Sequence, residues 1–270
     1  MNSPPYIHVL GLKAEEKFGI RADTGDLQKF HSYITEKYGR ADEEIIDRVF
    51  RSGEAAEFLT VNETYFFREP AHFLFFRGLL PSYEKTGLRV CCAAVSSGCE
   101  AYSIAMLLEN YNKSAVKPVV WHIDAFDINP KMIEAANKGI FSERTLREDG
   151  KTLHYLAGGY LGKPEKQNEG CESAFGHSAQ FRIDLNLKKN INFFVHNLMD
   201  KFPAENYDIV FFRNAYIYLT QKSRERILGN IAAALKEEGI LVMGVSETAG
   251  VQHSGIKDRN LNDVFYFTKT

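Results

Sequence analysis

Residues 88–111 read LRVCCAAVSSGCEAYSIAMLLENY, and residues 119–139 read VVWHIDAFDINPKMIEAANKG. Each stretch begins with a short apolar run of β-strand length and continues into a segment with the apolar spacing of a helix. Two such units in succession predict parallel strands joined by right-handed helical crossovers. In the second unit, Asn129 and Pro130 fit the N-cap and the first position of a helix, and Gly139 fits its C-terminal stop. These residues therefore predict an α/β protein with a Rossmann-like, doubly wound sheet.

The same alternation resumes in the C-terminal part of the chain. The strand YDIVFFRN at 207–214 precedes an amphipathic helix at 223–239, the strand GILVMGV at 239–245 and a final strand at 262–269. Between the two halves, residues 155–195 are rich in Gly, Lys and Asn and contain two short β-like pieces, AQFRIDL and NINFFVH. We predict that this part forms a small inserted β subdomain.

Residues 1 to about 60 carry helical patterns instead. At 26–39, Asp26 fits an N-cap, Gly39 fits a C-terminal stop, and three apolar residues share one face: Leu27, Phe30 and Ile34. A second helix, at 42–53, ends at Gly53. We predict an N-terminal helical domain at 1–70 and a second domain at 71–270 that carries the insert.

The composition limits the function classes. The 270 residues carry 33 Lys and Arg against 35 Asp and Glu, a net charge of -2, which lacks the basic excess that nucleic-acid backbones select. The four cysteines have no C-x-x-C spacing, and the eight histidines form no metal-binding motif. The N-terminus lacks the pattern of a signal peptide, and the longest apolar runs are too short to span a bilayer. We therefore expect a reduced, cytoplasmic protein with no metal site, no nucleic-acid partner and no membrane insertion.

In doubly wound sheets, ligands bind at the carboxyl ends of the strands, where the strand order reverses. After the first strand comes SSGCEAYS, in which Gly98 permits close approach of the backbone, although an ordinary strand-to-helix turn explains one glycine equally well. Asp127 ends the second strand, as a ribose-binding acid or simply as a cap. Asp124 is the rival acid, but it falls inside the strand. Further candidates follow the later strands: His196, Asn197 and Leu198, then Arg213 and Asn214.

Another candidate segment lies before the first strand. Residues 60–73 read TVNETYFFREPAHF, in which Phe66 and Phe67 can pack in a core while Arg68 has no role in packing. A surface salt bridge with Glu69 is one explanation of Arg68, and a ligand at the sheet is the other. Tyr218 presents a similar choice, because its segment AYIYL fits either a core aromatic or a residue at the site.

Five stretches in this order resemble the CheR family: NETYFFREPAHF (62–73), AAVSSGCEAYSIAM (93–106), FDINPKMIEAANKGIF (126–141), FFRNAYIYL (211–219) and GVSE (244–247). CheR proteins are bacterial methyltransferases that esterify glutamates of chemoreceptors with S-adenosylmethionine. The resemblance runs from about Thr60 to the end of the chain. It implies a class I S-adenosylmethionine-dependent methyltransferase fold, S-adenosyl-L-methionine as cofactor and S-adenosyl-L-homocysteine as product. The implied partner is the cytoplasmic region of a methyl-accepting chemoreceptor, and we expect the protein to act as a monomer.

The resemblance also implies roles for individual residues. It puts Arg68 beside the cofactor and the substrate and Tyr218 beside the transferred methyl group, as the two catalytic residues. It assigns Asp127 to the ribose, and Asn197 and Leu198 to the adenine region. The other cofactor-binding residues that it implies are Asn62, Thr64, Ala94, Gly98, Cys99, Arg213 and Asn214.

The chain departs from the family pattern in three respects. In place of a Gly-Glu-Glu-Pro turn it has Gly98 to Ala101, so the thiol of Cys99 replaces an acid expected near the amino group of the cofactor. Val245 stands in the histidine position of the family's GHSE motif. Residues 1–60 carry 8 Lys and Arg against 11 Asp and Glu, so the basic receptor-docking face of such proteins is not evident. An acceptor other than a standard chemoreceptor therefore stays open.

The expected chemistry needs few residues. A glutamate side chain, with a reference pKa of about 4.3, is already an anion at neutral pH, so no general base is required. A carboxylate and a sulfonium lose their charges as they react, so exclusion of water favours the step and a hydrogen-bond donor aims the oxygen. We therefore predict a protein-glutamate O-methyltransferase in which Arg68 orients the carboxylate and Tyr218 fixes its angle. Two alternatives stay open: a methyltransferase of another acceptor, such as a small molecule, and a non-catalytic adaptor.

Overall fold

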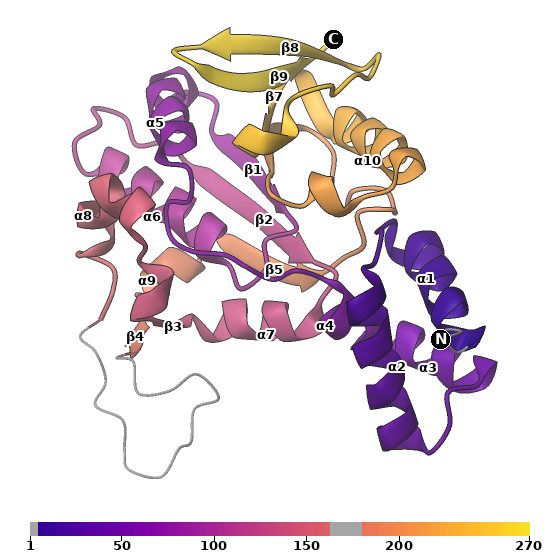
Figure 1. The fold of residues 1–270 in the computed structure, drawn as a ribbon. Coiled ribbons are helices and arrows are strands. Elements are labelled where there is room, and N and C mark those ends of the chain that lie inside the picture. The colour runs from indigo at the N-terminus through magenta and orange to yellow at the C-terminus, as the bar shows by residue number, and fades with distance from the viewer. Residues whose placement is uncertain (1–4, 163–179) are drawn as a thin grey trace.

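A computed structural model describes residues 5–162 and 180–270 of the chain. Within these residues, seven strands form one sheet in the order β5-β2-β1-β6-β7-β9-β8 (Figure 1). The strands are β1 (Leu88–Ala93), β2 (Trp121–Asp127), β5 (Ile191–Val195), β6 (Tyr207–Phe212), β7 (Leu235–Met243), β8 (Ile256–Leu261) and β9 (Val264–Lys269). The first five in sheet order are parallel, and β9 runs antiparallel to both of its neighbours. The strand order reverses between β1 and β6, which confirms the doubly wound, Rossmann-like prediction and locates the ligand-binding edge.

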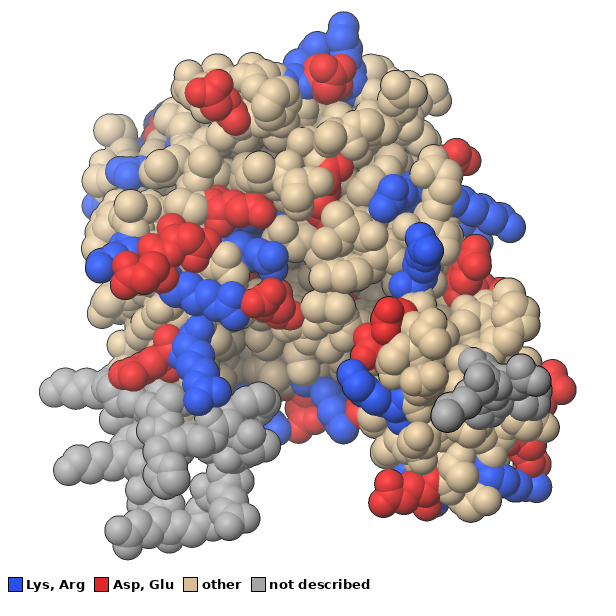
Figure 2. Space-filling model, viewed as in Figure 1, with Lys and Arg blue, Asp and Glu red and all other residues tan. Residues whose placement is uncertain are grey.

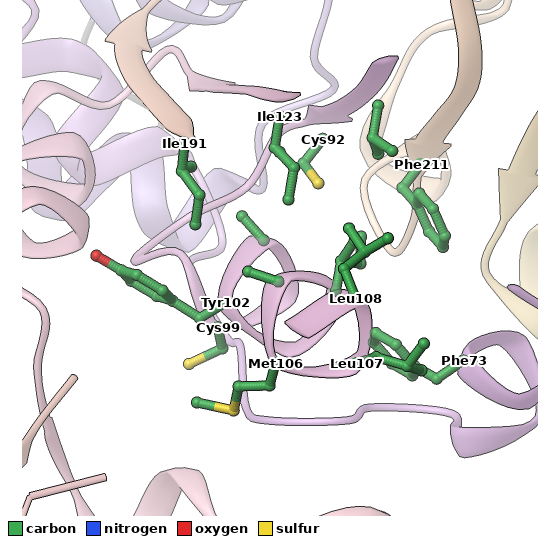
Figure 3. Close-up of a cluster of buried hydrophobic side chains, with 14 of the residues drawn as sticks. Phe73, Cys92, Cys99, Tyr102, Met106, Leu107, Leu108, Ile123, Ile191 and Phe211 are labelled. Atoms are coloured by element: carbon green, nitrogen blue, oxygen red, sulfur yellow. The ribbon is translucent and has the colours of Figure 1, made fainter. Parts of the chain in front are cut away.

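Alternating side chains of the strands build a core on each face of the sheet. On β1, Val90 and Cys92 belong to one cluster of buried residues and Cys91 and Ala93 to another. This alternation is the ordinary period of a strand, and both faces are apolar because helices cover both. The first cluster lies against α5 (Pro70–Leu79) and α6 (Cys99–Asn112), and the second lies against α10 (Gln221–Ala234). Figure 3 shows α6 with Leu108 toward the strands.

The N-terminal part folds as four helices with a core of their own. They are α1 (Pro5–Phe18), α2 (Thr24–Tyr38), α3 (Glu43–Ser52) and α4 (Glu54–Leu59), and Leu27, Phe30 and Ile34 are buried among them as expected. Gly39 ends α2 in the left-handed conformation, again as expected. The predicted N-cap was wrong by three residues, because the carboxylate of Asp23 accepts the hydrogen bond from Gly25 N and leaves Asp26 in the first turn.

A short pairing of two segments is one of the contacts between this helical part and the sheet domain. Ile20 and Leu219 form an isolated β-bridge, Arg21 N donates to Tyr218 O at 2.8 Å, and Thr220 N donates to Gly19 O at 3.0 Å. In Figure 1 the carboxyl ends of β1, β2 and β5 point toward these helices. The helical part therefore closes one side of the edge at which a ligand would bind. The division into domains at residue 70 stays a prediction.

The segment between the two halves of the sheet differs from the prediction. Residues 191–195 form β5, which pairs with β2 in the main sheet, because Ile191 and Phe193 are buried against its core. The small β element consists of β3 (Ile140–Ser142) and β4 (Gln180–Arg182), which pair antiparallel. The predicted insert also included residues 163–179, which lie outside the described part of the chain. Short helices surround this element: α7 (Pro130–Lys138), α8 (His154–Ala157), α9 (Leu185–Lys188) and the 3-10 turns at 143–145 and 148–153.

The C-terminal helix is shorter than its apolar pattern suggested. We expected it to continue to Gly239, but α10 ends at Ala234 and β7 begins at Leu235. Leu235 is buried and pairs with Tyr207 of β6, and Tyr207 is itself fully buried. Burial of this pair outweighs the helical pattern of the sequence.

Candidate active site

One cleft opens at the carboxyl ends of the central strands. It encloses about 1040 Å³ of empty space, counting the open solvent at its mouth. Its walls come from five regions: the end of α1, residues 59–68, the turn after β1, the ends of β2 and β5, and residues 213–219 after β6. Most of the predicted site residues line it, namely Asn62, Thr64, Arg68, Ala94, Asp127, Asn197, Leu198, Arg213, Asn214 and Tyr218.

The backbone around the cleft is strained. Ala94, Ser96 and Asn214 line it with positive φ angles of 61°, 52° and 59°. The segment before α5 has two more such residues, Phe67 at 54° and Glu69 at 58°. Non-glycine residues rarely adopt this conformation, which costs about 1 to 3 kcal/mol each and persists where surrounding contacts enforce it. The loops that end β1 and β6 are therefore held in fixed shapes at the cleft.

Asp127 supplies an acid at the end of β2. Its Oδ2 accepts from Ser96 N at 2.8 Å and its Oδ1 accepts from Asn129 N at 2.9 Å. Burial raises the pKa of Asp127, and backbone hydrogen bonds from Asn129, Ser96 and Ile128 oppose this rise. Asp127 thus braces two loops, as a cap would, yet each oxygen has spare acceptor capacity for a ligand hydroxyl. Asp124 does not line the cleft, and its carboxylate accepts from Tyr207 at 2.9 Å instead.

Arg68 lies on a segment that is anchored by its two preceding residues. Phe66 and Phe67 are fully buried, and Phe67 N donates to Ser103 Oγ of α6 at 3.0 Å. The guanidinium of Arg68 donates to Glu63 O at 3.1 Å and lies 5.4 Å from the centre of the Tyr65 ring. Among the described residues, Arg68 forms no ion pair. The salt bridge with Glu69, which was the alternative explanation of Arg68, is therefore absent.

Glu69 pairs with Arg213 instead, in a buried network within the cleft wall. The side chain of Arg213 is only 2% exposed, with Nη2 3.1 Å from Glu69 Oε2 and Nη1 3.0 Å from Glu100 Oε2. Burial alone would raise the pKa of Glu69, but His72, the charge of Arg213 and Asn214 together lower it. Burial raises the pKa of Glu100, against the opposing charge of Arg213. One cation thus serves two acids, and Glu100 also lines the cleft.

Glu247 fixes the loop that carries Tyr218. Its carboxylate accepts from Asn214 N at 2.6 Å, Gly244 N at 3.0 Å and Ile217 N at 3.2 Å. It therefore ties the chain after β6 to the chain after β7. Tyr218 is 37% exposed, so it is not a core aromatic. Val245 is 65% exposed and does not line the cleft.

Asn197 joins the end of β5 to the helical part. Its Nδ2 donates to Lys17 O at 2.6 Å, and its Oδ1 accepts from Met199 N at 3.0 Å. Leu198 follows it, and Phe18 and Ile20 of the helical part line the same end of the cleft. No sequence pattern marks these two residues as part of a site, because apolar residues near the end of a helix are typical of a core.

Two predicted site residues do not line the cleft. Gly98 precedes α6 with φ of 92°, and a Cβ there would lie 3.2 Å from the Phe193 ring, on the far side of the turn. Cys99 is fully buried, and burial raises the pKa of its thiol to about 12, against hydrogen bonds with Ser97 and Thr64. Figure 3 shows Cys99 on the side of α6 that faces away from Cys92 and Ile123. The acid that faces the cleft is the next residue, Glu100, which sequence reasoning missed.

Two other features bear on the function of the chain. Within residues 5–162 and 180–270, no helix is long and apolar enough to cross a membrane. In the same residues, no group of three or more His, Cys, Asp and Glu side chains is arranged to hold a metal ion.

Comparison with known proteins identifies the family. Residues 62–262 match the family model "CheR methyltransferase, SAM binding domain". The chain is 32% identical over 205 residues to the chemotaxis protein methyltransferase of Borreliella burgdorferi, with 72% of this chain and 67% of that protein covered. It is 33% identical over 205 residues to the chemotaxis protein methyltransferase of Escherichia coli, with 73% and 65% covered.

A search of solved structures finds methyltransferase folds at lower similarity. The structure of the DhpI–SAH complex is 17% identical, with a TM-score of 0.32 and with 74% of this chain and 70% of that chain covered. The family match rests on the sequence comparisons, which span most of the chain. The chain therefore belongs to the CheR methyltransferase family, and its cofactor is S-adenosylmethionine.

Proposed function

We propose that the chain is a protein-glutamate O-methyltransferase, acting in the cytoplasm on the cytoplasmic region of a chemoreceptor. The observation that carries the proposal is the state of Arg68, a cleft-lining arginine without an ion-pair partner in the described residues. A carboxylate brought by a substrate would complete its pairing. The relatives are named chemotaxis protein methyltransferases, which supports an acceptor that takes part in chemotaxis.

The cleft residues fit the cofactor. Asp127 offers carboxylate lone pairs to the ribose hydroxyls, and Asn197 and Leu198 lie at the next strand end outward, where the base would follow. The turn at Ala94 brings backbone close to the cleft with no long side chain in the way. When bound, S-adenosylmethionine supplies an electrophilic methyl group on a positively charged sulfur, and Glu100 provides an acid in the same cleft.

The residues proposed for the reaction aim the acceptor and exclude water. The guanidinium of Arg68 can hold a carboxylate with two parallel hydrogen bonds, which fixes its plane as well as its position. The hydroxyl of Tyr218 can donate to the same carboxylate from another wall of the cleft. Phe73, Phe126 and Leu219 add apolar surface that displaces water from the reacting atoms. None of these residues has to carry a proton, because the acceptor is already ionised.

Labelled methyl transfer tests the proposal. The protein is incubated with methyl-labelled S-adenosylmethionine and the cytoplasmic fragment of a receptor from the same organism, and the product is treated with mild alkali. We expect incorporation into the fragment and release of the label as methanol, because carboxyl methyl esters are cleaved by alkali. Label that survives alkali would overturn the glutamate acceptor. Binding of the cofactor with no transfer to the fragment would favour the non-catalytic adaptor.

Two variants test the proposed roles. Displacement of reacting atoms by about an ångström can cost on the order of a hundredfold, so Arg68→Ala and Tyr218→Phe should lower turnover by about that factor. Tyr216→Phe is the matched control, because Tyr216 is buried, stands two residues away and does not line the cleft. Near-normal turnover in a folded Arg68→Ala protein would contradict the role of this arginine.

A further inference from the structure

A cluster of polar side chains surrounds Tyr65 at the edge of the cleft. The hydroxyl of Tyr65 donates to Asp149 Oδ2 at 2.7 Å. The guanidinium groups of Arg68 and Arg147 lie 5.4 Å and 4.5 Å from the centre of its ring. Arg147 donates to Glu63 Oε1 at 2.6 Å. The two anchoring residues, Arg147 and Asp149, come from the segment that follows β3, far away in the sequence.

The polar groups of this cluster differ in whether they have a carboxylate partner. Arg147 has a carboxylate partner in Glu63, and the hydroxyl of Tyr65 has one in Asp149. Within the described residues, Arg68 contacts the carbonyl oxygen of Glu63 and the face of the Tyr65 ring and forms no ion pair. Figure 2 shows acidic and basic side chains interleaved across the middle of the viewed face, so no single sign dominates there. Within the described residues, Arg68 is therefore the cation of this cluster that has no carboxylate partner, and it lines the cleft.

The position of Arg68 depends on Tyr65. An arginine side chain loses rotamer freedom when it is fixed, and one hydrogen bond to a carbonyl does not offset that loss. The face of an aromatic ring adds a second attraction for the guanidinium. Loss of the ring would leave the Arg68 guanidinium with one weak contact and several competing rotamers.

The ring of Tyr65 is itself held from outside its own segment. Phe66 N donates to Thr145 O at 2.9 Å, and a Cβ at Gly150 would lie 2.5 Å from Phe66 O, so the two segments pack too closely for any larger residue. Together with the contacts of Arg147 and Asp149, these backbone contacts fix the segment that carries Arg68. The segment 145–150 thus acts as the support of this wall of the cleft.

We propose that Tyr65, clamped by Arg147 and Asp149, is a positioning residue that holds Arg68 in the orientation needed to aim the acceptor. This inference rests on the proposed function of Arg68. Tyr65 acts through the arginine and has no chemical step of its own. Arg147 and Asp149 act one step further away, by fixing the ring.

A double-mutant cycle tests whether the effect of Arg68 depends on Tyr65. The rate of methyl transfer is measured for each variant, and calorimetry with S-adenosylhomocysteine measures binding of the nucleotide. Tyr65→Leu removes the ring and should lower kcat by about tenfold, while affinity for S-adenosylhomocysteine changes by no more than about threefold. In an Arg68→Ala background, Tyr65→Leu should cause no further loss, because the residue that it positions is gone. Equal losses in both backgrounds would overturn the proposal, since Tyr65 would then act on the fold in general.

Conservative variants separate the ring from the hydroxyl. Tyr65→Phe keeps the ring and should retain at least about a third of the wild-type kcat. Arg144→Gln is the matched control, because Arg144 is an exposed arginine three residues from Arg147 and makes none of these contacts. Amide hydrogen exchange at 60–68 should increase in Tyr65→Leu and not in Arg144→Gln. Unchanged exchange and unchanged kcat in Tyr65→Leu would also reject the proposal.

The positioning test does not depend on which atom accepts the methyl group. Alkali release of the label reports on the glutamate acceptor, whereas the cycle compares rates with whatever acceptor is methylated. An alkali-stable product with a non-additive cycle would reject the proposed acceptor and keep the role of Tyr65. An alkali-labile product with additive losses in the cycle would keep the proposed acceptor and reject the role of Tyr65.

Discussion

The two ends of the parallel strands both carry buried acids, but the acids are satisfied differently. At the amino-terminal side, Asp124 accepts from side chains on three other strands of the sheet, Tyr207, Arg89 and Asn192. At the carboxyl-terminal side, the hydrogen bonds that Asp127 accepts within the described residues come from backbone amides, including those of Ser96 and Asn129. The two aspartates stand three residues apart on one strand. The side-chain partners make Asp124 part of the scaffold, whereas Asp127 keeps acceptor capacity for a ligand.

Charge pairing and most of the backbone strain follow the same division. Three strained residues line the cleft at the carboxyl ends, and the buried Arg213 in its wall serves two acids. Two other residues, Asn206 before β6 and Glu238 in β7, have positive φ angles away from the cleft. At the other end, Asp208 pairs with Lys236 and accepts from the backbone of Arg89. Strain and shared counter-charges cost stability, and they concentrate where the chemistry takes place. One sheet is thus built for stability at one end and for binding at the other.

The largest expected difference between the two ends comes from their arginines. Arg213→Met removes the cation from two buried acids and should lower the free energy of unfolding by about 3 to 5 kcal/mol, because breaking a buried ion pair leaves a charge uncompensated. Arg89→Met is the control at the other end, where the side chain is 43% exposed and Asp124 keeps its other donors. It should cost about 1 kcal/mol or less. Urea unfolding at neutral pH measures the free energy of unfolding of both variants. Equal losses would contradict the difference between the two ends of the sheet.

The two aspartates should separate binding from stability. Asp127→Asn should weaken binding of S-adenosylhomocysteine roughly tenfold to 150-fold, the range for lost hydrogen bonds to a charged group. Asp124→Asn should leave that affinity within about threefold and lower stability instead, because its carboxylate bonds only to the protein. Calorimetry and urea unfolding on both variants check this. A large loss of affinity in Asp124→Asn with little loss of stability would contradict the assignment of the two ends.

The next effect depends on pH and concerns Glu69. Its pKa is lower in the folded than in the unfolded chain, so its contribution to stability is complete above the ordinary value of 4.5 and is lost as the pH falls below it. The free energy of unfolding should therefore exceed that of Glu69→Gln by about 1.5 kcal/mol near neutral pH, and this gap should narrow below about pH 4.5. Glu44→Gln, on an exposed side chain of α3, is the control. A gap that widens on acidification would contradict the sign of the shift.

Local patterns in the sequence predicted much of the fold. They also predicted the site residues that stand at the ends of strands. The βα alternation and the caps at Asn129 and Gly139 were confirmed, because they depend on residues close together in the sequence. The edge strand at 191–195 was assigned to the insert, because its partner β2 lies more than 60 residues away. The helix that was expected to reach Gly239 stops early for the same kind of reason, the burial of Leu235 against Tyr207. Pairing across the sheet overrides local pattern in both cases.

Within the site, the sequence could name residues but not the direction of their side chains. Asp127 ends a recognisable strand, and Arg68 follows two phenylalanines that pack in the core. Both residues line the cleft. Cys99 and Glu100 are neighbours on the first turn of α6, and the helix directs one into the core and the other toward the cleft. Phe18 and Ile20 reach the cleft only because the helical part docks on residues 218–220. These placements depend on tertiary contacts, which no local pattern contains.

The smallest expected effect is that of Cys99, which the resemblance placed beside the cofactor's amino group. The thiol is fully buried and does not line the cleft, so Cys99→Ala should leave the affinity for S-adenosylhomocysteine within about twofold and cost about 1 kcal/mol of stability. Cys99→Glu should destabilise the fold by several kcal/mol rather than tighten binding, because it buries a carboxylate without a partner. Glu100→Gln is the contrast, since Glu100 lines the cleft and should change affinity. If Cys99→Glu instead bound the nucleotide more tightly in a stably folded protein, this side of α6 would have to open to the cofactor, and the missing acid of the family pattern would be a real deficit.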